Sequence, residues 1–322
     1  MTIRLIATDL DGTLLDPQQQ VTARTRSALD AARAAGIEVV PVTARQPVGL
    51  RLIAEQAGFD GWALCGNGAL GVHLGTGEHL FEAQLSVPAQ RQLAEALLQR
   101  LPEAVFVSVR EGGETFVAQE GYADLADFND HKRDPDSMVA HTVDQVLDQP
   151  SLKFIVRHPG TDNDELVATI RGLGLSGFEV THSGAPFVEV LAEGVTKAWG
   201  LARLCTHLGI APDEVLAFGD APNDAEMLAW AGHGVAMADA APETLAVADQ
   251  VTGTNIDDGV ADVIEALTQA PATHPDRAMQ PDQAARTTQP EHPGRTTQPD
   301  HPGRTTQPDH PGGGQRPGAP LR

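Results

Sequence analysis

Short apolar runs separated by helix-length stretches organise both ends of the chain. The apolar run at residues 3–7 is followed by a stretch at 22–35, which begins with the capping residue Thr22 and ends before Gly36, and then by a second apolar run at 37–42. A strand, a helix and a second strand within about forty residues are typical of the crossover unit of a parallel sheet. The sequence predicts further strands at 62–65, 215–218, 234–237 and near 251, and further helices at 48–57, 197–207, 222–231, 242–248 and 259–267.

The pattern between residues 70 and 189 is different. Short alternating runs at 71–74 and 80–85, separated by turn residues, indicate hairpins rather than crossovers. Beyond them the sequence predicts helices at 89–101, 144–147 and 162–173, strands at 105–110, 115–119, 152–157, 178–181 and 187–191, and an acidic, irregular stretch at 122–136. Helices mixed with antiparallel strands indicate an α+β domain inserted into the parallel one.

The predicted fold class is therefore α/β, with a Rossmann-like parallel sheet core and an inserted α+β domain. We place the core at residues 1–81 and 190–270 and the inserted domain at 82–189. Residues 271–322 have another character, because a nonapeptide repeat begins at Arg286, Arg295 and Arg304 and large apolar residues are almost absent. Such a proline-rich segment buries too little surface to compensate its chain entropy, so the sequence predicts a disordered tail without a catalytic role.

The charge of the chain limits which kinds of molecule the protein is expected to bind. The chain has 44 acidic and 22 basic residues, and its formal charge is −22. Five acids and six bases lie from Pro271 onward, which leaves 39 acids, 16 bases and a charge of −23 before it. A surface this acidic disfavours nucleic acid and anionic membranes as partners. No apolar run approaches the roughly 18 residues of a membrane span, and we expect a cytoplasmic protein whose two cysteines are buried thiols.

The candidate chemistry begins directly after the first strand. Asp9 and Asp11 are one residue apart, and on a continuing strand their side chains would point to opposite faces. Gly12 permits a turn that could bring both carboxylates to one site at the carboxyl end of the sheet. Taken alone, the motif is more simply explained as a polar turn.

Other predicted strand ends supply partners for these acids. They carry Thr43, Asn67, and the pair Asp220 and Asp224, and a lone lysine, Lys197, opens a helix of the same domain. Only three lysines precede Pro271, and an anionic substrate would need such a positive centre. The shared position of these residues at one sheet edge indicates a functional site.

Taken together, the motifs closely resemble those of the haloacid dehalogenase (HAD) superfamily of phosphotransferases, specifically its Cof-type branch (class IIB). The resemblance covers roughly residues 2–267. It is carried by residues 5–15 (Leu-Ile-Ala-Thr-Asp-Leu-Asp-Gly-Thr-Leu-Leu), 43–45 (Thr-Ala-Arg), 67–69 (Asn-Gly-Ala), 194–197 (Gly-Val-Thr-Lys), 219–220 (Gly-Asp) and 223–224 (Asn-Asp). The family often has glycine where Ala44 stands, and Pro222 lies inside the last motif, but neither change removes a reacting group.

The resemblance implies a HAD fold whose inserted domain is a cap, and the activity of a phosphoric monoester hydrolase. It assigns Asp9 as the nucleophile that forms an aspartyl-phosphate and Asp11 as the general acid and base. It also implies a Mg²⁺ cofactor. The phosphate-binding residues would be Thr43, Ala44, Lys197 and Asn223, and the metal-binding residues would be Asp9, Asp11 through its main-chain carbonyl, Asp220 and Asp224, the last through a bound water unless it orients Lys197.

The expected substrate is a small phosphate ester, such as a sugar phosphate or a cofactor phosphate, and the cap would select it. Arg45, Asn67 and the triplet His131-Lys132-Arg133 are candidates for contacting it, although the triplet is equally consistent with an exposed loop balanced by neighbouring aspartates. A phosphomutase of the same superfamily and a non-catalytic binding protein with this fold are the alternatives. The sequence does not predict the oligomeric state.

Overall fold

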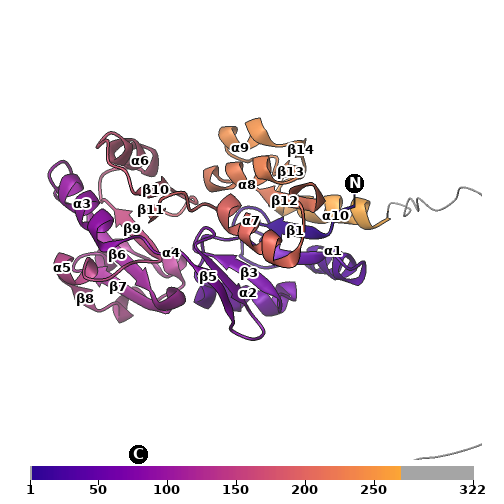
Figure 1. Cartoon of the computed structure of the whole chain (residues 1–322), viewed down its shortest axis with the longest axis horizontal. Helices are drawn as coiled ribbons and strands as arrows, with labels where there is room; N and C mark the ends of the chain where they lie inside the picture. The colour runs from indigo at the N-terminus through magenta and orange to yellow at the C-terminus, as the bar shows by residue number, and fades with distance from the viewer. Residues whose placement is uncertain (1, 270–322) are drawn as a thin grey trace, which may run out of the picture. The chain divides into compact units, whose positions relative to one another are not determined.

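A five-stranded parallel sheet forms the core of the protein, whose computed structural model describes residues 2–269 (Figure 1). The strands run in the order β14-β13-β12-β1-β2, and every neighbouring pair is parallel. Their bounds are β1 Leu5–Thr8, β2 Glu38–Pro41, β12 Val215–Gly219, β13 His233–Ala236 and β14 Gln250–Val251. The strand β1 therefore lies between β2 and the central strand β12, which comes from the far end of the chain, as Figure 1 shows by the indigo and orange ribbons.

Six helices accompany this sheet: α1 Ala23–Ala34, α2 Pro47–Ala57, α7 Lys197–Leu208, α8 Ala225–Trp230, α9 Pro242–Val247 and α10 Gly259–Gln269. The predicted cap of α1 is present, because the Thr22 hydroxyl accepts a hydrogen bond from the Thr25 N–H. Thr196 caps α7 in the same way by accepting from the Trp199 N–H, and this fixes where Lys197 begins the helix. One hydrophobic core runs through the sheet and these helices.

The third strand of the predicted core belongs mainly to a separate sheet. β3 (Trp62–Cys65), β4 (Leu70–His73) and β5 (His79–Glu82) form the order β3-β4-β5 with antiparallel pairs, which confirms the hairpins. One parallel bridge between Val42 and Leu64 joins β3 to the edge of the first sheet. The pairing between these two strands is limited to one bridge partly because Pro41, at the end of β2, has no N–H to donate.

Residues 82–189, predicted as the cap and called the cap segment below, contribute most of a six-stranded sheet. Its order is β10-β11-β9-β6-β7-β8, and all pairs are antiparallel except β7 with β8. The strands are β6 Val105–Arg110, β7 Thr115–Gln119, β8 Ala140–His141, β9 Lys153–Arg157, β10 Phe178–Thr181 and β11 Val188–Ala192, and the helices are α3 Val87–Leu98, α4 Phe128–His131, α5 Val143–Val146 and α6 Asn163–Arg171. The segment boundaries themselves remain a prediction.

The two faces of this sheet have different roles. Phe154 and Val156 of β9 pack into an apolar cluster with residues of α3, α5 and α6. Alternation along the strand turns Lys153, Ile155 and Arg157 to the other face. That face carries a smaller apolar cluster, which contains Ile155, and it faces the site described next.

The differences from the predicted elements are local. The stretch at 122–136, predicted to be irregular, contains the short helix α4, whose N-terminus is closed by a capping box at Asp127 and Asp130. Six short 3-10 turns complete the described elements: η1 Glu111–Gly113, η2 Ala123–Leu125, η3 Pro135–Ser137, η4 Pro212–Glu214, η5 Pro222–Asp224 and η6 Asn255–Asp257. Pro222 opens η5, a position where its missing N–H is not needed.

Three further expectations concern the chain as a whole. Cys65 and Cys205 are free and buried, as predicted, and burial raises the pKa of both thiols to about 12. Within residues 2–269 no helix has both the length and the apolar character needed to cross a bilayer. The predicted disordered tail lies outside the described residues.

Candidate active site

The turn after β1 delivers Asp9 to a buried position at the carboxyl edge of the sheet. The N–H groups of Thr13, Leu14 and Leu15 all converge on the carbonyl oxygen of Leu10, so the chain reverses directly after the strand. Gly12 has φ +87°, and a Cβ there would lie 2.3 Å from Oδ2 of Asp220. Glycine is therefore required both by the turn and by the close approach of Asp220.

Lys197 contacts the Asp9 carboxylate from the first turn of α7. Its Nζ donates to Oδ1 of Asp9 at 2.7 Å and to Oδ1 of Asp224 at 2.5 Å, and its side chain is 1% exposed. The start of α7 packs closely on the turn between β3 and β4, where a Cβ on Gly68 would lie 2.4 Å from the carbonyl oxygen of Thr196. Helix packing thus carries the lysine into the centre of the site.

The two acids that follow β12 are held in different ways. Asp224 is fully buried, and its Oδ2 accepts hydrogen bonds from the N–H groups of Asp220 and Ala221, both at 3.0 Å. Asp220 accepts a 2.6 Å hydrogen bond from the hydroxyl of Thr13 at Oδ1. Asp9, Asp220 and Asp224 each offer a carboxylate oxygen within 4.8 Å of the others.

The cluster of Asp9, Asp220 and Asp224 carries more negative charge than Lys197 neutralises. Burial raises the pKa of Asp9 well above its usual range, against the pull of Lys197, and Asp224 and Asp220 raise it further. Burial and Asp224 raise the pKa of Asp220 to about 6. Burial disfavours the Lys197 ammonium, but Asp224 and Asp9 outweigh it and raise the pKa of Lys197. One ammonium serves three carboxylates, and the donor set of hard oxygen atoms fits a divalent cation.

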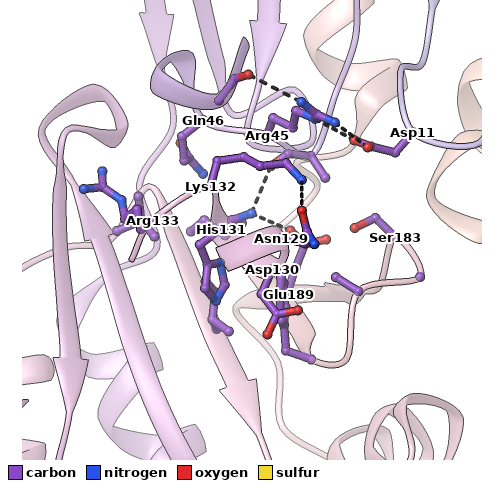
Figure 2. Close-up of a pocket in the computed structure, with 18 of the residues that line it drawn as sticks. Asp11, Arg45, Gln46, Asn129, Asp130, His131, Lys132, Arg133, Ser183 and Glu189 are labelled. Atoms are coloured by element: carbon purple, nitrogen blue, oxygen red, sulfur yellow. Dashed lines mark hydrogen bonds and ion pairs between the residues drawn. The ribbon is translucent and has the colours of Figure 1, made fainter. Parts of the chain in front are cut away.

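Asp11 is directed to a different partner. Arg45 donates from Nε to Oδ2 of Asp11 at 2.7 Å and from Nη2 to Oδ1 at 2.5 Å, a bidentate ion pair that Figure 2 shows as paired dashed lines. Gln19 donates to Oδ1 of Asp11 at 3.1 Å and accepts from Arg45 at 3.0 Å. The structure therefore holds Asp11 and Arg45 together beside the cluster, whereas Asp9 contacts Lys197.

The remaining predicted site residues lie at the neighbouring strand ends. Thr43 is buried, and its hydroxyl accepts from the Arg45 N–H at 3.0 Å. Asn67 is buried with φ +57°, and its Oδ1 accepts from Nδ2 of Asn223 at 2.9 Å. Asn223 does not line the large cavity described below; it lies on a smaller one together with Asn67 and Lys197.

Two buried residues of the cap segment belong to the site although they were not among the candidates. Lys153 of β9 donates to Oε1 of Glu189 in β11 at 2.5 Å and to the carbonyl oxygen of Ala44 at 2.9 Å. The second oxygen of Glu189 accepts from Nδ2 of Asn67 at 3.0 Å. The sequence does carry a signal for Glu189, which interrupts a strand whose other positions are apolar, whereas Lys153 only opens β9 before three apolar residues.

A cavity of about 450 Å³ opens between these groups and the cap segment, and Figure 2 shows its lining. Asp11, Arg45 and Ala44 line it from the core, and the triplet His131-Lys132-Arg133 lines it from the cap segment. The triplet is not simply an exposed loop, because all three residues are partly buried and line the cavity. The Tyr122 hydroxyl lies 2.7 Å from Nε2 of His131, and burial lowers the pKa of His131 to about 2. Phe116, Ile155 and Phe187 add an apolar part to the wall.

Comparison with known proteins identifies the family. The profile of the haloacid dehalogenase-like hydrolases matches residues 6–264. A putative phosphatase of Bacillus subtilis is 32% identical over 285 residues, covering 83% of this chain and 99% of that protein. An HMP-PP phosphatase of Cronobacter sakazakii is 32% identical over 254 residues, covering 76% of this chain and 87% of that protein.

Solved structures confirm the predicted fold. The crystal structure of a haloacid dehalogenase-like hydrolase from Bacteroides thetaiotaomicron superposes with a TM-score of 0.66 at 27% identity, covering 83% of this chain and all of that one. Both the α/β fold class and the resemblance to the Cof-type branch are thereby confirmed. The chain belongs to the haloacid dehalogenase-like hydrolases, in the Cof-type branch that the family profile describes, and it is a phosphatase.

Proposed function

We propose that the protein is a Mg²⁺-dependent phosphatase that hydrolyses a small phosphorylated metabolite through an aspartyl-phosphate at Asp9. The observation that carries the proposal is the buried contact of the Lys197 ammonium with both Asp9 and Asp224 beside the third carboxylate, Asp220. Such a cluster fixes the nucleophile in position and gathers carboxylates that suit a divalent cation, whose charge, together with Lys197, would favour the ionised form of Asp9.

The first half of the reaction transfers the phosphoryl group to the protein. Oδ of Asp9 forms a bond to phosphorus, and the ester bond between phosphorus and the leaving oxygen breaks. Lys197 favours the ionised form of Asp9 against the effect of burial and neutralises charge next to the phosphoryl oxygens, and the Thr43 hydroxyl is available to donate to one of them. Asp11 gives its proton to the leaving oxygen, which departs as a neutral alcohol.

The second half returns the protein to its starting state. Asp11, now ionised, takes a proton from a water molecule as that water attacks phosphorus, and the bond to Asp9 breaks to release inorganic phosphate. To donate a proton at all, Asp11 must first give up the bidentate contact with Arg45 that it has in this structure. Substrate that engages Arg45 would free Asp11 for this role.

The proposed metal site consists of Asp9, Asp220 and the main-chain carbonyl of Asp11, and Asp224 acts through Lys197 or through a bound water. Mg²⁺ bound there would supply the positive charge that the three carboxylates lack, and would stabilise the charge of the transferring phosphoryl group. We place Ala44 and Asn223 at the edge of the phosphate site, and Arg45 and Asn67 nearer the leaving group.

The proposed substrate is a sugar phosphate or a cofactor phosphate. The cavity of about 450 Å³ lies in the usual range for a small-molecule site, and both walls carry hydrogen-bonding groups. The relative named as an HMP-PP phosphatase supports this choice of small phosphate esters.

The test is release of inorganic phosphate from p-nitrophenyl phosphate and from a panel of sugar and cofactor phosphates, with Mg²⁺ or with EDTA. We expect turnover that requires Mg²⁺ and that falls by at least about 10⁴-fold in Asp9→Asn, because the nucleophile is lost. Asp60→Asn, an exposed acid away from the cavity, is the control. Absence of Mg²⁺-dependent turnover across the panel would contradict the function, and a rephosphorylated sugar product would indicate a mutase.

A further inference from the structure

The ammonium group of Lys132 lies on the cavity wall opposite the residues that carry the proposed chemistry. Lys132 follows α4, with φ +53°, and its side chain crosses the upper part of the cavity in Figure 2 toward Arg45 and Asp11. Its Nζ donates to Oδ1 of Asn129 at 3.3 Å. A leaving group bound between the two walls would meet this ammonium.

Lys132 differs from Arg45 and Lys153, which also line the cavity, in having no close carboxylate partner. Arg45 is paired with Asp11, and Lys153 is paired with Glu189. Among residues 2–269, no carboxylate oxygen lies within 4.0 Å of Nζ of Lys132. The chain has 44 acidic residues, yet the partly buried ammonium of Lys132 has only the amide oxygen of Asn129 as its hydrogen-bond partner.

Among residues 2–269 the neighbouring Arg133 also has no carboxylate within 4.0 Å, but main-chain carbonyls hold its guanidinium. Its guanidinium donates to the carbonyl oxygens of Gly113 and Glu114 and lies 5.4 Å from the centre of the Phe116 ring. In Figure 2 it extends away from the group formed by Lys132, Arg45 and Asp11. Arg133 therefore supports the wall, whereas Lys132 presents its charge to the cavity.

The surroundings of Lys132 favour an additional anion. Burial lowers the pKa of Lys132, and repulsion by Arg45 lowers it further, against the weaker opposing effect of Asp11, Asp127 and Asp130. A ligand anion between Lys132 and Arg45 would remove that repulsion and replace it with attraction to both.

A second unsatisfied group lies on the same cavity. The side-chain amide of Gln46, directly after Arg45, is buried, and neither its Nε2 nor its Oε1 has a hydrogen-bond partner among the described residues. Buried amides are normally paired, so this one is available to both a donor and an acceptor of a ligand. Lys132 and Gln46 are independent indications that the cavity wall is built for a polar leaving group.

We propose that Lys132 binds a second anionic group, a carboxylate or a second phosphate, on the part of the substrate that leaves, and that Gln46 hydrogen-bonds the polar atoms beside it. The preferred substrate is thus a phosphate ester with two anionic ends. This inference rests on the proposed phosphatase function and narrows its substrate class. Sugar phosphates with an uncharged second end are correspondingly poorer substrates.

The test compares substrates that differ only at the second end. One pair is 6-phosphogluconate and sorbitol 6-phosphate, which are both open-chain and test a carboxylate, and the other is fructose 1,6-bisphosphate and fructose 6-phosphate, which tests a second phosphate. We expect the wild-type kcat/KM to be higher for at least one doubly anionic member, and Lys132→Gln to reduce that preference by about tenfold to a hundredfold, the effect of losing one charge-assisted hydrogen bond.

Two variants control for other effects of the substitution. Lys132→Arg keeps the charge and is expected to retain most of the preference. Arg91→Gln removes one positive charge from an exposed position on α3, where Arg91 pairs with Asp144, and is expected to leave the preference at the wild-type level. Equal kcat/KM within both pairs for the wild type, or an unchanged preference in Lys132→Gln, would overturn the inference.

A binding measurement separates this inference from the proposed function. Calorimetric dissociation constants for the same four compounds are measured with the inactivated variant Asp9→Asn, with and without Lys132→Gln. Tighter binding of a doubly anionic compound by the Asp9→Asn variant, lost when Lys132→Gln is added, supports the inference. It does so even if no assay shows turnover, because absent turnover contradicts only the proposed phosphatase function. Equal binding of all four compounds overturns the inference.

Discussion

The Asp11 carboxylate cannot both bind Arg45 through its two oxygens and carry the proton that a general acid must donate. In the structure both of its oxygens accept from Arg45. A carboxyl group that carries a proton accepts a bidentate guanidinium poorly, because one oxygen is then a donor. Proton donation by Asp11 therefore requires separation from Arg45, and substrate binding is the event that we expect to cause it.

This assignment predicts that Asp11→Asn is sensitive to the leaving group. An alkoxide leaving group needs a proton, whereas p-nitrophenolate leaves readily without one. We expect Asp11→Asn to lower kcat by about 10²- to 10⁴-fold for an alkyl phosphate such as glucose 6-phosphate, and much less for p-nitrophenyl phosphate. Steady-state kinetics on the two substrates measures the difference.

Asp60→Asn is the matched control for this experiment too, because it removes an exposed carboxylate from the same domain. An equal loss on both substrates in Asp11→Asn would mean that the residue positions the phosphoryl group or the metal, and would remove it as the general acid.

Sequence reasoning found site residues where a motif fixes their place and missed those placed by tertiary packing. Asp9, Lys197, Asp220 and Asp224 were identifiable because each follows a strand or opens a helix of the parallel sheet. The direction of the Asp11 side chain was not, because it depends on a partner 34 residues away. Roles that depend on chemistry rather than position remain predictions.

At the scale of elements, the charged pair between β9 and β11 fastens the cap segment to the core. Lys153 and Glu189 are both almost fully buried, and they reach the core through the carbonyl of Ala44 and the amide of Asn67. Both charges are largely removed from solvent, so each depends on the other. The pair sits on the strand face that turns toward the cavity, rather than on the face covered by helices.

We predict that Lys153→Met lowers the free energy of unfolding by about 3–5 kcal/mol, because it leaves the Glu189 charge buried without a partner. Adding Glu189→Leu should restore most of the loss, since an apolar pair replaces an unpaired charge. Urea denaturation followed by circular dichroism measures both.

The exposed pair of Arg51 and Glu114 provides the comparison, because its side chains are 63% and 54% exposed. Arg51→Met should change stability little, as solvent screens such a pair. If the double variant proves less stable than Lys153→Met, the idea that the unpaired charge causes the loss is wrong.

The predicted elements agree closely with the structure where the apolar period is clear. Strands β3, β6, β7 and β10 have the predicted bounds, and most helices differ by a few residues at their ends. The short helix α4 was missed because it lies in an acidic stretch without an apolar period, whereas α5, which is equally short and has a similar capping box, was predicted. The sequence pattern does not specify which strand β3 pairs with. Its pairing with β4, which places it in a separate antiparallel sheet, was therefore not predicted.

For the whole molecule, the family profile ends at residue 264 and the described structure at residue 269. We predict that a chain ending at residue 270 keeps the kcat/KM of the full chain, since every proposed site residue precedes this point. The melting temperature should also stay within about 2 °C, which corresponds to about 1 kcal/mol for a domain of this size. Calorimetry and the phosphate-release assay on both chains test this prediction. A loss of turnover on truncation would mean that residues 271–322 contribute to catalysis.

The position of β1 has a consequence for the order of events during synthesis. This strand pairs with β12 on one side, and Asp9 meets Lys197 188 residues later in the sequence. At roughly 5–20 residues per second, the ribosome needs on the order of 10–40 s to add that much chain. Throughout this interval the nascent chain carries an apolar strand with an open edge, so the first strand made is among the last to be fully paired, and its protection falls to chaperones.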